Sequence, residues 1–369
     1  MEYNHWRNQA NSVLEERNVS KDRKKKTDGK RVVLIILCIF LALVLLALIG
    51  IAVIQHYLGL INRDVDNSTM SNEEYEQWLE EQTEVATGTA PEIAPEEVTW
   101  EDQYIEQGDH VINILLIGQD RREGEGRQRS DAMILCTVNT DTKTLTMTSF
   151  MRDLYVQIPG YSPNKMNACY QIGGMNLLDS CLETNFGVTV DGNLEVDFSG
   201  FMNVVDMMGG VDLELNQAEA DYLNRRGNWD VNNSSAGTWN LKAGMNHLTG
   251  EQALAYSRIR YVGNGDFERT ERQRKVLTAM VEQSRDLSIP QLNGLLQAAL
   301  PLLTTDLSNQ EILGYAASVF KILPELKINT QRIPADGTWE YAVINNLDVV
   351  RMFDVNANVD LLRVAMDEE

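Results

Sequence analysis

Residues 113–152, which read NILLIGQDRREGEGRQRSDAMILCTVNTDTKTLTMTSFMR, decide the fold. An apolar run that starts at Val111 and ends at Gly118 predicts a strand, and strand-like runs follow over residues 132–138 and 144–149. Charged residues gather where these strands end, and they include Asp120, Arg129, Asp131 and Arg152. Because α/β proteins place their sites at strand ends and in the adjoining loops, we expect a charged functional site here.

The composition limits the class of protein. The 369 residues are 43% hydrophobic, which is enough for a substantial core, and the length allows one large domain or two ordinary ones. The formal net charge of −22 argues against general nucleic-acid binding, which requires a basic surface. The four histidines pair with no nucleophile, and GxSxG and HExxH motifs are absent, so a Ser/His/Asp hydrolase has little support.

An uncharged, almost wholly apolar segment occupies residues 32–54 and follows a run of lysines and arginines. At ~1.5 Å per residue it is long enough to cross the ~30 Å core of a membrane. The positive-inside rule then predicts a single-pass signal-anchor helix, with a cytoplasmic tail over residues 1–31 and the rest outside. The alternative is a cleaved signal peptide, although the segment exceeds the usual apolar length of about 7–15 residues.

The remaining chain divides into a spacer and a folded domain. Residues 55–108 are acidic and predict an extended spacer with a helical piece near residues 72–84. Strand-like and helical segments alternate over residues 109–369, with residues 165–174 expected as a loop and the C-terminal tail as strand and loops. Further helices are expected near residues 175–185, 198–208, 216–226, 270–285, 290–303 and 308–322, with a short helix capped by Thr249.

Two arginines two residues apart, Arg258 and Arg260, form the sharpest candidate anion site. If this segment is extended, both guanidinium groups lie on one face, where two forks suit a diphosphate. Arg269 and Arg272 likewise share a face near the start of the long helix, close to Asp266. The alternative for both pairs is a solvated face with ion pairs to nearby acidic residues.

Two carboxylates flank the first loop, and such a pair can hold Mg²⁺ together with phosphate oxygens. The alternative for Asp120 and Asp131 is capping or ion pairing with neighbouring arginines. Lys165 lies in a predicted loop, where it contacts either phosphate or water. Cys136 is expected in the core, whereas Cys169 and Cys181 are compatible either with a disulfide or with free thiols.

These motifs together resemble the LytR–CpsA–Psr family of cell-envelope phosphotransferases. The resemblance covers residues 111–277 and rests on eight pieces in the family's order. They are NILLIGQDRR, RSDAM, SFMRD, IPGY, KMNACYQIGG, VDFSGFMNVVDMMGGVDLEL, LTGEQALAYSRIRY and DFERTERQRKVL. Two positions depart from the family pattern: Ala168-Cys169 follows Asn167, and Glu268 adds a negative charge beside Arg269.

The resemblance implies an α/β/α sandwich with a central mixed, mostly antiparallel sheet, and an apolar groove for a polyprenyl chain. It implies transfer of a glycopolymer, such as a teichoic acid or a capsule, from undecaprenyl pyrophosphate to peptidoglycan at the membrane of a Gram-positive-type envelope. Asp120 and Asp131 would hold Mg²⁺ or Mn²⁺, and Asp266 is a candidate general base. Pyrophosphate would contact Arg129, Arg152, Lys165, Arg258, Arg260, Arg269, Arg272 and Gln273, with Arg152 also acting in catalysis.

Two other functions remain open. The first is hydrolysis of a polyprenyl pyrophosphate, in which water takes the place of the acceptor. The second is a non-catalytic lipid-binding or regulatory protein of the envelope. Residues 1–31 contain no DNA-binding motif, which argues against a regulatory role.

Overall fold

The computed structural model describes residues 45, 48, 50–63, 65–81, 86, 89–119, 126–226, 239–285 and 287–367. The chain forms two compact units, Met1–Gly59 and Leu60–Glu369. In the first unit residues 50–58 are helical, and most of the predicted membrane span over residues 32–54 lies outside the described residues. Among the helices that are described, none combines the length and apolar character needed to cross a membrane.

The second unit is built on a mixed sheet whose six described strands run in the order β10–β3–β2–β1–β6–β9. Strands β1 and β6 pair in parallel, as do β10 and β3, and the other three pairings are antiparallel. This confirms the predicted mixed, mostly antiparallel sheet. The strands are β1 Val111–Gln119, β2 Ser130–Asn139, β3 Thr144–Phe150, β6 Gly192–Asp197, β9 Leu303–Thr305 and β10 Lys327–Ile333.

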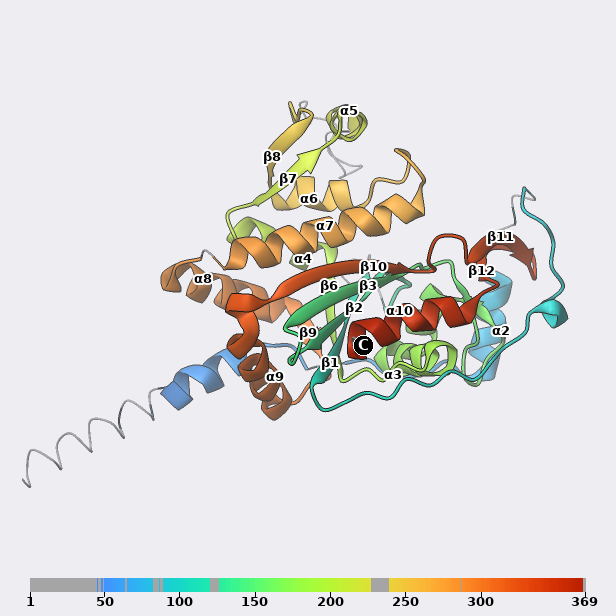
Figure 1. The fold of residues 1–369 in the computed structure, drawn as a ribbon, viewed down its shortest axis with the longest axis horizontal. Helices are drawn as coiled ribbons and strands as arrows, with labels where there is room; N and C mark the ends of the chain where they lie inside the picture. The colour runs from blue at the N-terminus through green and yellow to red at the C-terminus, as the bar shows by residue number, and fades with distance from the viewer. Residues whose placement is uncertain are drawn as a thin grey trace, which may run out of the picture. The chain divides into compact units, whose positions relative to one another are not determined.

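Helices cover both faces of this sheet (Figure 1). Side chains alternate along each strand, so Leu115 and Leu135 join the core beneath helices α3 (Met166–Phe186) and α10 (Val355–Asp367). Ile112 and Ile134 face the opposite side, where helix α7 (Asp266–Ser284) crosses β3 and β10. The outcome is the predicted α/β/α arrangement.

A smaller core lies beyond α7, between helices and a two-stranded antiparallel sheet. Tyr256 and Val276 are buried in it, and Thr249 caps the start of α6 through a capping box with Gln252, as predicted. The elements around it are α4 Phe198–Met207, β7 Val211–Leu215, α5 Gln217–Arg226, β8 Gly244–Leu248 and α6 Gly250–Ser257, followed by α8 Ile289–Ala299 and α9 Asn309–Ile322. The remaining elements are α2 Asn72–Glu81, β4 Tyr155–Val156, β5 Asn164–Lys165, β11 Trp339–Ile344 and β12 Leu347–Met352, with short 3-10 turns at Pro95–Glu97, Leu300–Leu302 and Leu323–Glu325.

Three expectations from the sequence differ from the structure. The acidic segment is not simply an extended spacer, because Tyr75 and Trp78 of α2 are buried in the main core. Residues 166–174, expected as a loop, form the first half of α3. The C-terminal tail contains α10, whose apolar face packs on the sheet. In each case tertiary burial decides the structure of a segment whose local pattern is weak.

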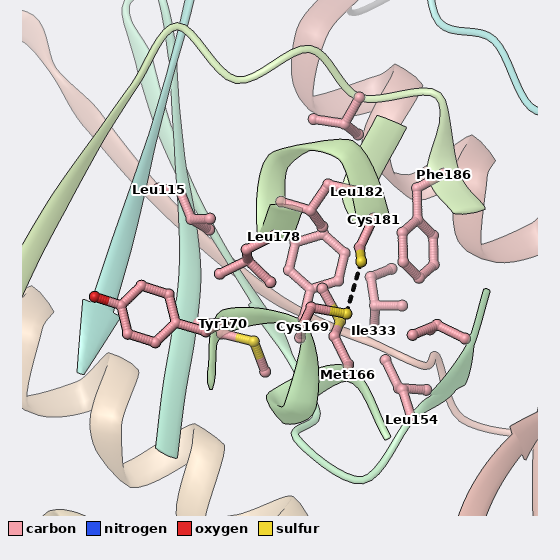
Figure 2. Close-up of a cluster of buried hydrophobic side chains, with 14 of the residues drawn as sticks. Leu115, Leu154, Met166, Cys169, Tyr170, Leu178, Cys181, Leu182, Phe186 and Ile333 are labelled. Atoms are coloured by element: carbon pink, nitrogen blue, oxygen red, sulfur yellow. Dashed lines mark hydrogen bonds between the residues drawn. The ribbon is translucent and has the colours of Figure 1, made fainter. Parts of the chain in front are cut away.

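The two halves of α3 meet at a kink, and this kink brings two cysteines together (Figure 2). Gly174 has φ 67° and ψ −155°, a conformation that favours glycine. In a straight helix twelve residues rise about 18 Å. Because the helix folds at Gly173–Gly174, the sulfurs of Cys169 and Cys181 lie only 2.6 Å apart in the core.

We expect these two thiols to form a disulfide when the protein meets an oxidised thiol–disulfide exchange partner. The sulfurs already face one another, so the bond requires a shift of about half an ångström. Closing this short loop should raise the free energy of unfolding by about 2–3 kcal/mol relative to the reduced protein. Peptide mapping of the oxidised chain should find the Cys169–Cys181 cross-link. Full alkylation of both thiols in the oxidised, denatured protein would contradict it, and Cys181→Ala is the control.

Candidate active site

Charged side chains meet where β2 begins and β3 ends. The register that pairs Ile134 with Ser149, continued three residues along both chains, brings Asp131 opposite Arg152. The Nη1 atom of Arg152 donates a hydrogen bond of 3.0 Å to Oδ1 of Asp131. Its Nε atom lies 3.3 Å from Oδ2 of Asp153 and 3.9 Å from Oδ2 of Asp266. Burial alone lowers the pKa of Arg152, but these three carboxylates outweigh it and the pKa is raised, so Arg152 keeps its charge.

Asp266 is brought to this point by the start of α7. The residue before it, Gly265, has φ 60° and ψ −124°, which favours glycine and turns the chain sharply into the helix. Asp266 Oδ1 lies 3.1 Å from Nε of Arg269, one turn along α7, and 3.4 Å from Nε of Arg260. Arg260 also approaches Asp131 Oδ1 at 3.8 Å. We call Asp131, Arg152, Arg260, Asp266 and Arg269 the charged cluster.

Several atoms of the charged cluster are buried but lack hydrogen bonds of good geometry. They are Nε of Arg152, Nε of Arg269 and Oδ1 of Asp266, which make ion contacts only. Arg269 is 3% exposed, and burial lowers its pKa to about 10, so it remains protonated at neutral pH. Buried donors and acceptors normally find hydrogen-bond partners, so the protein itself leaves part of the hydrogen-bonding capacity of the charged cluster unfilled.

A largely apolar cavity of about 480 Å³ opens beside the charged cluster. Strands β1, β2 and β6 form one wall, and helices α4, α6 and α7 form the other. The wall includes Asp131, Arg260 and Arg269, so the cluster borders the cavity directly. The other lining residues are mainly apolar, and they include Leu116, Ala132, Ile134, Leu194, Val196, Phe201, Val204, Leu254, Val276, Leu277 and Met280. We call it the apolar cavity.

The predicted Arg258–Arg260 pair reaches this cavity in a different way from the one expected. The segment is not a strand: Arg258 ends α6 in a helical conformation, with φ −104° and ψ 0°. Its guanidinium lies 4.3 Å from the ring centroid of Phe198 at the start of α4, a cation–π contact. Arg260 instead points to Asp131 and Asp266, yet both arginines line the apolar cavity, as does Gln273.

Other predicted residues lie away from the charged cluster. Arg272 is 2% exposed, and it binds Glu219 at 2.8 Å and Glu268 at 2.7 Å, so it joins α7 to α5. Glu268, the charge that departs from the family pattern, is thereby paired with Arg272. The guanidinium carbon of Arg129 lies 5.3 Å from the ring centroid of Trp78, over the ring. Asp120 lies outside the described residues.

Two residues that the sequence analysis did not select lie in the site. Asp153 contacts Arg152, and its Oδ1 atom lies 3.5 Å from Nζ of Lys165. Its position directly after Arg152 in the sequence could have indicated that it lies in the site. Phe198 contacts Arg258, and no local pattern indicated this contact.

The carboxylates present suit a magnesium ion that binds together with a phosphate. In the part of the chain that the structure describes, no three His, Cys, Asp or Glu side chains form a metal cluster. Mg²⁺ does not require one, because it keeps several waters and commonly takes one or two carboxylates plus phosphate oxygens. Asp131 and Asp266 both belong to the charged cluster, and Asp266 has an oxygen without a hydrogen bond.

Comparisons with known proteins agree with one another. Regulatory protein MsrR of Staphylococcus aureus is 28% identical over 267 residues, which are 71% of this chain and 76% of MsrR. The polyisoprenyl-teichoic acid–peptidoglycan teichoic acid transferase TagU of Oceanobacillus iheyensis is 31% identical, over 63% of this chain and 71% of TagU. The solved structure of Bacillus subtilis TagT bound to LI-WTA has a TM-score of 0.56 and 26% identity, covering 73% of this chain and 99% of that one.

A family model provides the broadest match. It covers residues 67–358, which include the whole central sheet, both cavity walls and the charged cluster. The chain therefore belongs to the LytR_cpsA_psr family.

Proposed function

We propose that this protein transfers a glycopolymer from a polyprenyl pyrophosphate carrier to peptidoglycan. One observation supports this most strongly: an apolar cavity of about 480 Å³ has arginines 260 and 269 in its wall. A ligand that fills both parts must have an apolar tail and an anionic head, which is the chemistry of a polyprenyl pyrophosphate. The relatives TagU and TagT are both named polyisoprenyl-teichoic acid–peptidoglycan teichoic acid transferases, which supports this proposal.

The charged cluster accounts for the chemistry of the transfer. The acceptor hydroxyl oxygen forms a bond to the sugar-proximal phosphorus, and the bond from this phosphorus to the bridging oxygen breaks, releasing the lipid phosphate. Phosphoryl transfer mainly requires positioning and charge neutralisation. Arg152, Arg260 and Arg269 supply both through hydrogen bonds to phosphate oxygens, with Arg258 beside them. The carboxylate of Asp266 accepts the proton of the acceptor hydroxyl.

Magnesium would supply further charge neutralisation on the phosphates when bound. We propose that the carboxylates of Asp131 and Asp120 would hold the magnesium ion. Both residues follow from the family motif, and Asp131 also borders the phosphate-binding arginines. We further propose that residues 32–54 anchor the chain in the membrane that contains the lipid donor.

The test uses the full chain in detergent with a polyprenyl pyrophosphate disaccharide, with and without peptidoglycan fragments. Covalent transfer of sugar phosphate to the glycan, reduced on removing Mg²⁺ and in Asp266→Asn, would establish the proposal. Release of sugar phosphate to water, without transfer, would indicate a pyrophosphate hydrolase instead. Tight donor binding with neither product would favour a regulatory lipid-binding protein.

A further inference from the structure

A second cavity, of about 370 Å³, also borders the charged cluster, and cluster members that do not line the apolar cavity line this one. Arg260 lines both cavities, whereas Arg152 and Asp266 line the second. Its outer wall is the hairpin of β11 and β12, through Tyr341 and Asp348, and its floor includes Lys165 and Asp153. We call it the hairpin cavity. Unlike the apolar cavity, it has a lining in which charged side chains predominate, with Tyr341, Met151, Val349 and Val350 beside them.

An aromatic stack fixes this hairpin to the catalytic elements. Phe267, the residue after Asp266, stacks on Trp339 of β11 with ring centroids 4.2 Å apart. Trp339 in turn meets Tyr341 edge to face at 5.0 Å. Tyr341 is 52% exposed, and it both packs on the stack and lines the cavity. The stack therefore holds Tyr341 at a set position relative to Asp266.

An aromatic ring beside charged side chains, as in the hairpin cavity, suits a carbohydrate ligand. A sugar ring presents C–H groups that pack on an aromatic face, and its hydroxyls bind carboxylate and ammonium groups. Tyr341 supplies the aromatic face, and Asp153, Lys165 and Asp348 supply polar partners around it. The pKa of Tyr341 is raised by its partial burial and by the negative charges of Asp266 and Asp153.

The direction of the reaction decides which sugar enters. Displacement at phosphorus is in line, so the acceptor oxygen approaches opposite the departing oxygen. With the lipid tail in the apolar cavity, the departing lipid phosphate lies on that side of the charged cluster. The acceptor must then approach from a side away from the apolar cavity. The hairpin cavity offers such an approach, because Arg152 and Asp266 line it and do not line the apolar cavity.

We propose that the hairpin cavity binds the acceptor sugar of the glycan, with Tyr341 as its aromatic platform. This inference rests on the proposed transfer reaction and adds where the acceptor binds. The acceptor hydroxyl points to Asp266, gives up its proton to that carboxylate and attacks the phosphorus held by Arg152 and Arg260. The donor's own sugars leave the phosphate sideways, away from the line between the two cavities.

The experiment compares the full chain with Tyr341→Ala and Tyr341→Phe, using a polyprenyl pyrophosphate disaccharide as donor and soluble peptidoglycan fragments as acceptor. We expect Tyr341→Ala to raise the KM for the acceptor about tenfold, which corresponds to about 1.4 kcal/mol. The Kd for the donor should stay at the wild-type value. Tyr341→Phe, which keeps the ring, should restore most of the acceptor affinity. Tyr104→Ala, at a 73% exposed tyrosine outside both cavities, is the matched control.

The outcomes separate this inference from the proposed function. A parallel rise in donor Kd and acceptor KM would overturn it and assign the hairpin cavity to the donor's sugar. An unchanged acceptor KM in Tyr341→Ala would also overturn it. If the wild type shows no transfer, direct calorimetry of glycan-fragment binding decides: loss of binding in Tyr341→Ala supports the subsite although the transfer reaction has failed. Equal binding by both proteins would refute it.

Discussion

Replacing Arg152 with alanine is expected to reduce the rate of glycopolymer transfer by on the order of 10³-fold. Arg152 is the centre of the charged cluster, with Asp131 at 3.0 Å, Asp153 at 3.3 Å and Asp266 at 3.9 Å. Without its guanidinium, three carboxylates face the incoming pyrophosphate with less opposing charge. The transition state then loses a bidentate donor at the point where negative charge accumulates. Both effects act in the same direction, so this is the most sensitive single position.

Two further variants give this prediction its controls. Arg152→Lys keeps the charge but not the planar fork, so we expect a loss intermediate between wild type and Arg152→Ala. Arg363→Ala removes an arginine that also pairs with an aspartate, Asp360 at 2.7 Å, but lies on α10 across the sheet from the apolar cavity. Its transfer rate should equal that of wild type. Steady-state transfer is measured beside a thermal melt of each variant, and wild-type turnover by folded Arg152→Ala would refute the assigned role.

The sequence indicated that Asp131 and Arg152 both lie at strand ends within one charged region, and it did not indicate their contact. Alternating strand patterns flank a short turn over residues 139–143, and the turn sets the register that pairs Asn139 with Thr144. The paired residues extend to Ile134 and Ser149, and the ion pair of Asp131 and Arg152 forms just beyond them. Local pattern and tertiary structure agree here, and the prediction of β1, β2 and β3 was correct to within a few residues.

Arg258 and Arg260 show where local reasoning fails. The spacing of two residues suggested one strand face, but the chain leaves helix α6 at Arg258 and turns through a loop before α7. The stacking of Arg258 on Phe198 joins segments about 60 residues apart in sequence, and no periodicity records such a contact. The same limit applies to Tyr341 and Asp348, which reach the site through tertiary contacts such as the stacking of Trp339 on Phe267 and the bridge between Leu154 and Val350.

The second large effect is expected from filling the apolar cavity. Ala132 lies on β2 next to the charged cluster and lines the cavity, with Gly118 opposite it in the sheet. Ala132→Phe places a ring where we propose the first isoprene units of the donor bind. Excluding one five-carbon unit removes about 3–4 kcal/mol of apolar burial, so donor affinity should fall by on the order of 10²-fold. Phenylalanine favours strands and fills empty apolar space, so the melting temperature should stay equal or rise.

If Ala132→Phe weakens donor binding but leaves the melting temperature unchanged, the loss is due to the cavity and not to a destabilised fold. The same substitution at an exposed position of α9, Ala316→Phe, is the matched control and should bind donor as wild type does. Donors of decreasing chain length sharpen the test, because the penalty of Ala132→Phe should shrink as the tail shortens. An equal loss for a water-soluble pyrophosphate sugar with no tail would show that the ring disturbs the charged cluster. The cavity would then have no demonstrated part in holding the lipid, since only a tail-dependent penalty reports on contact between tail and wall.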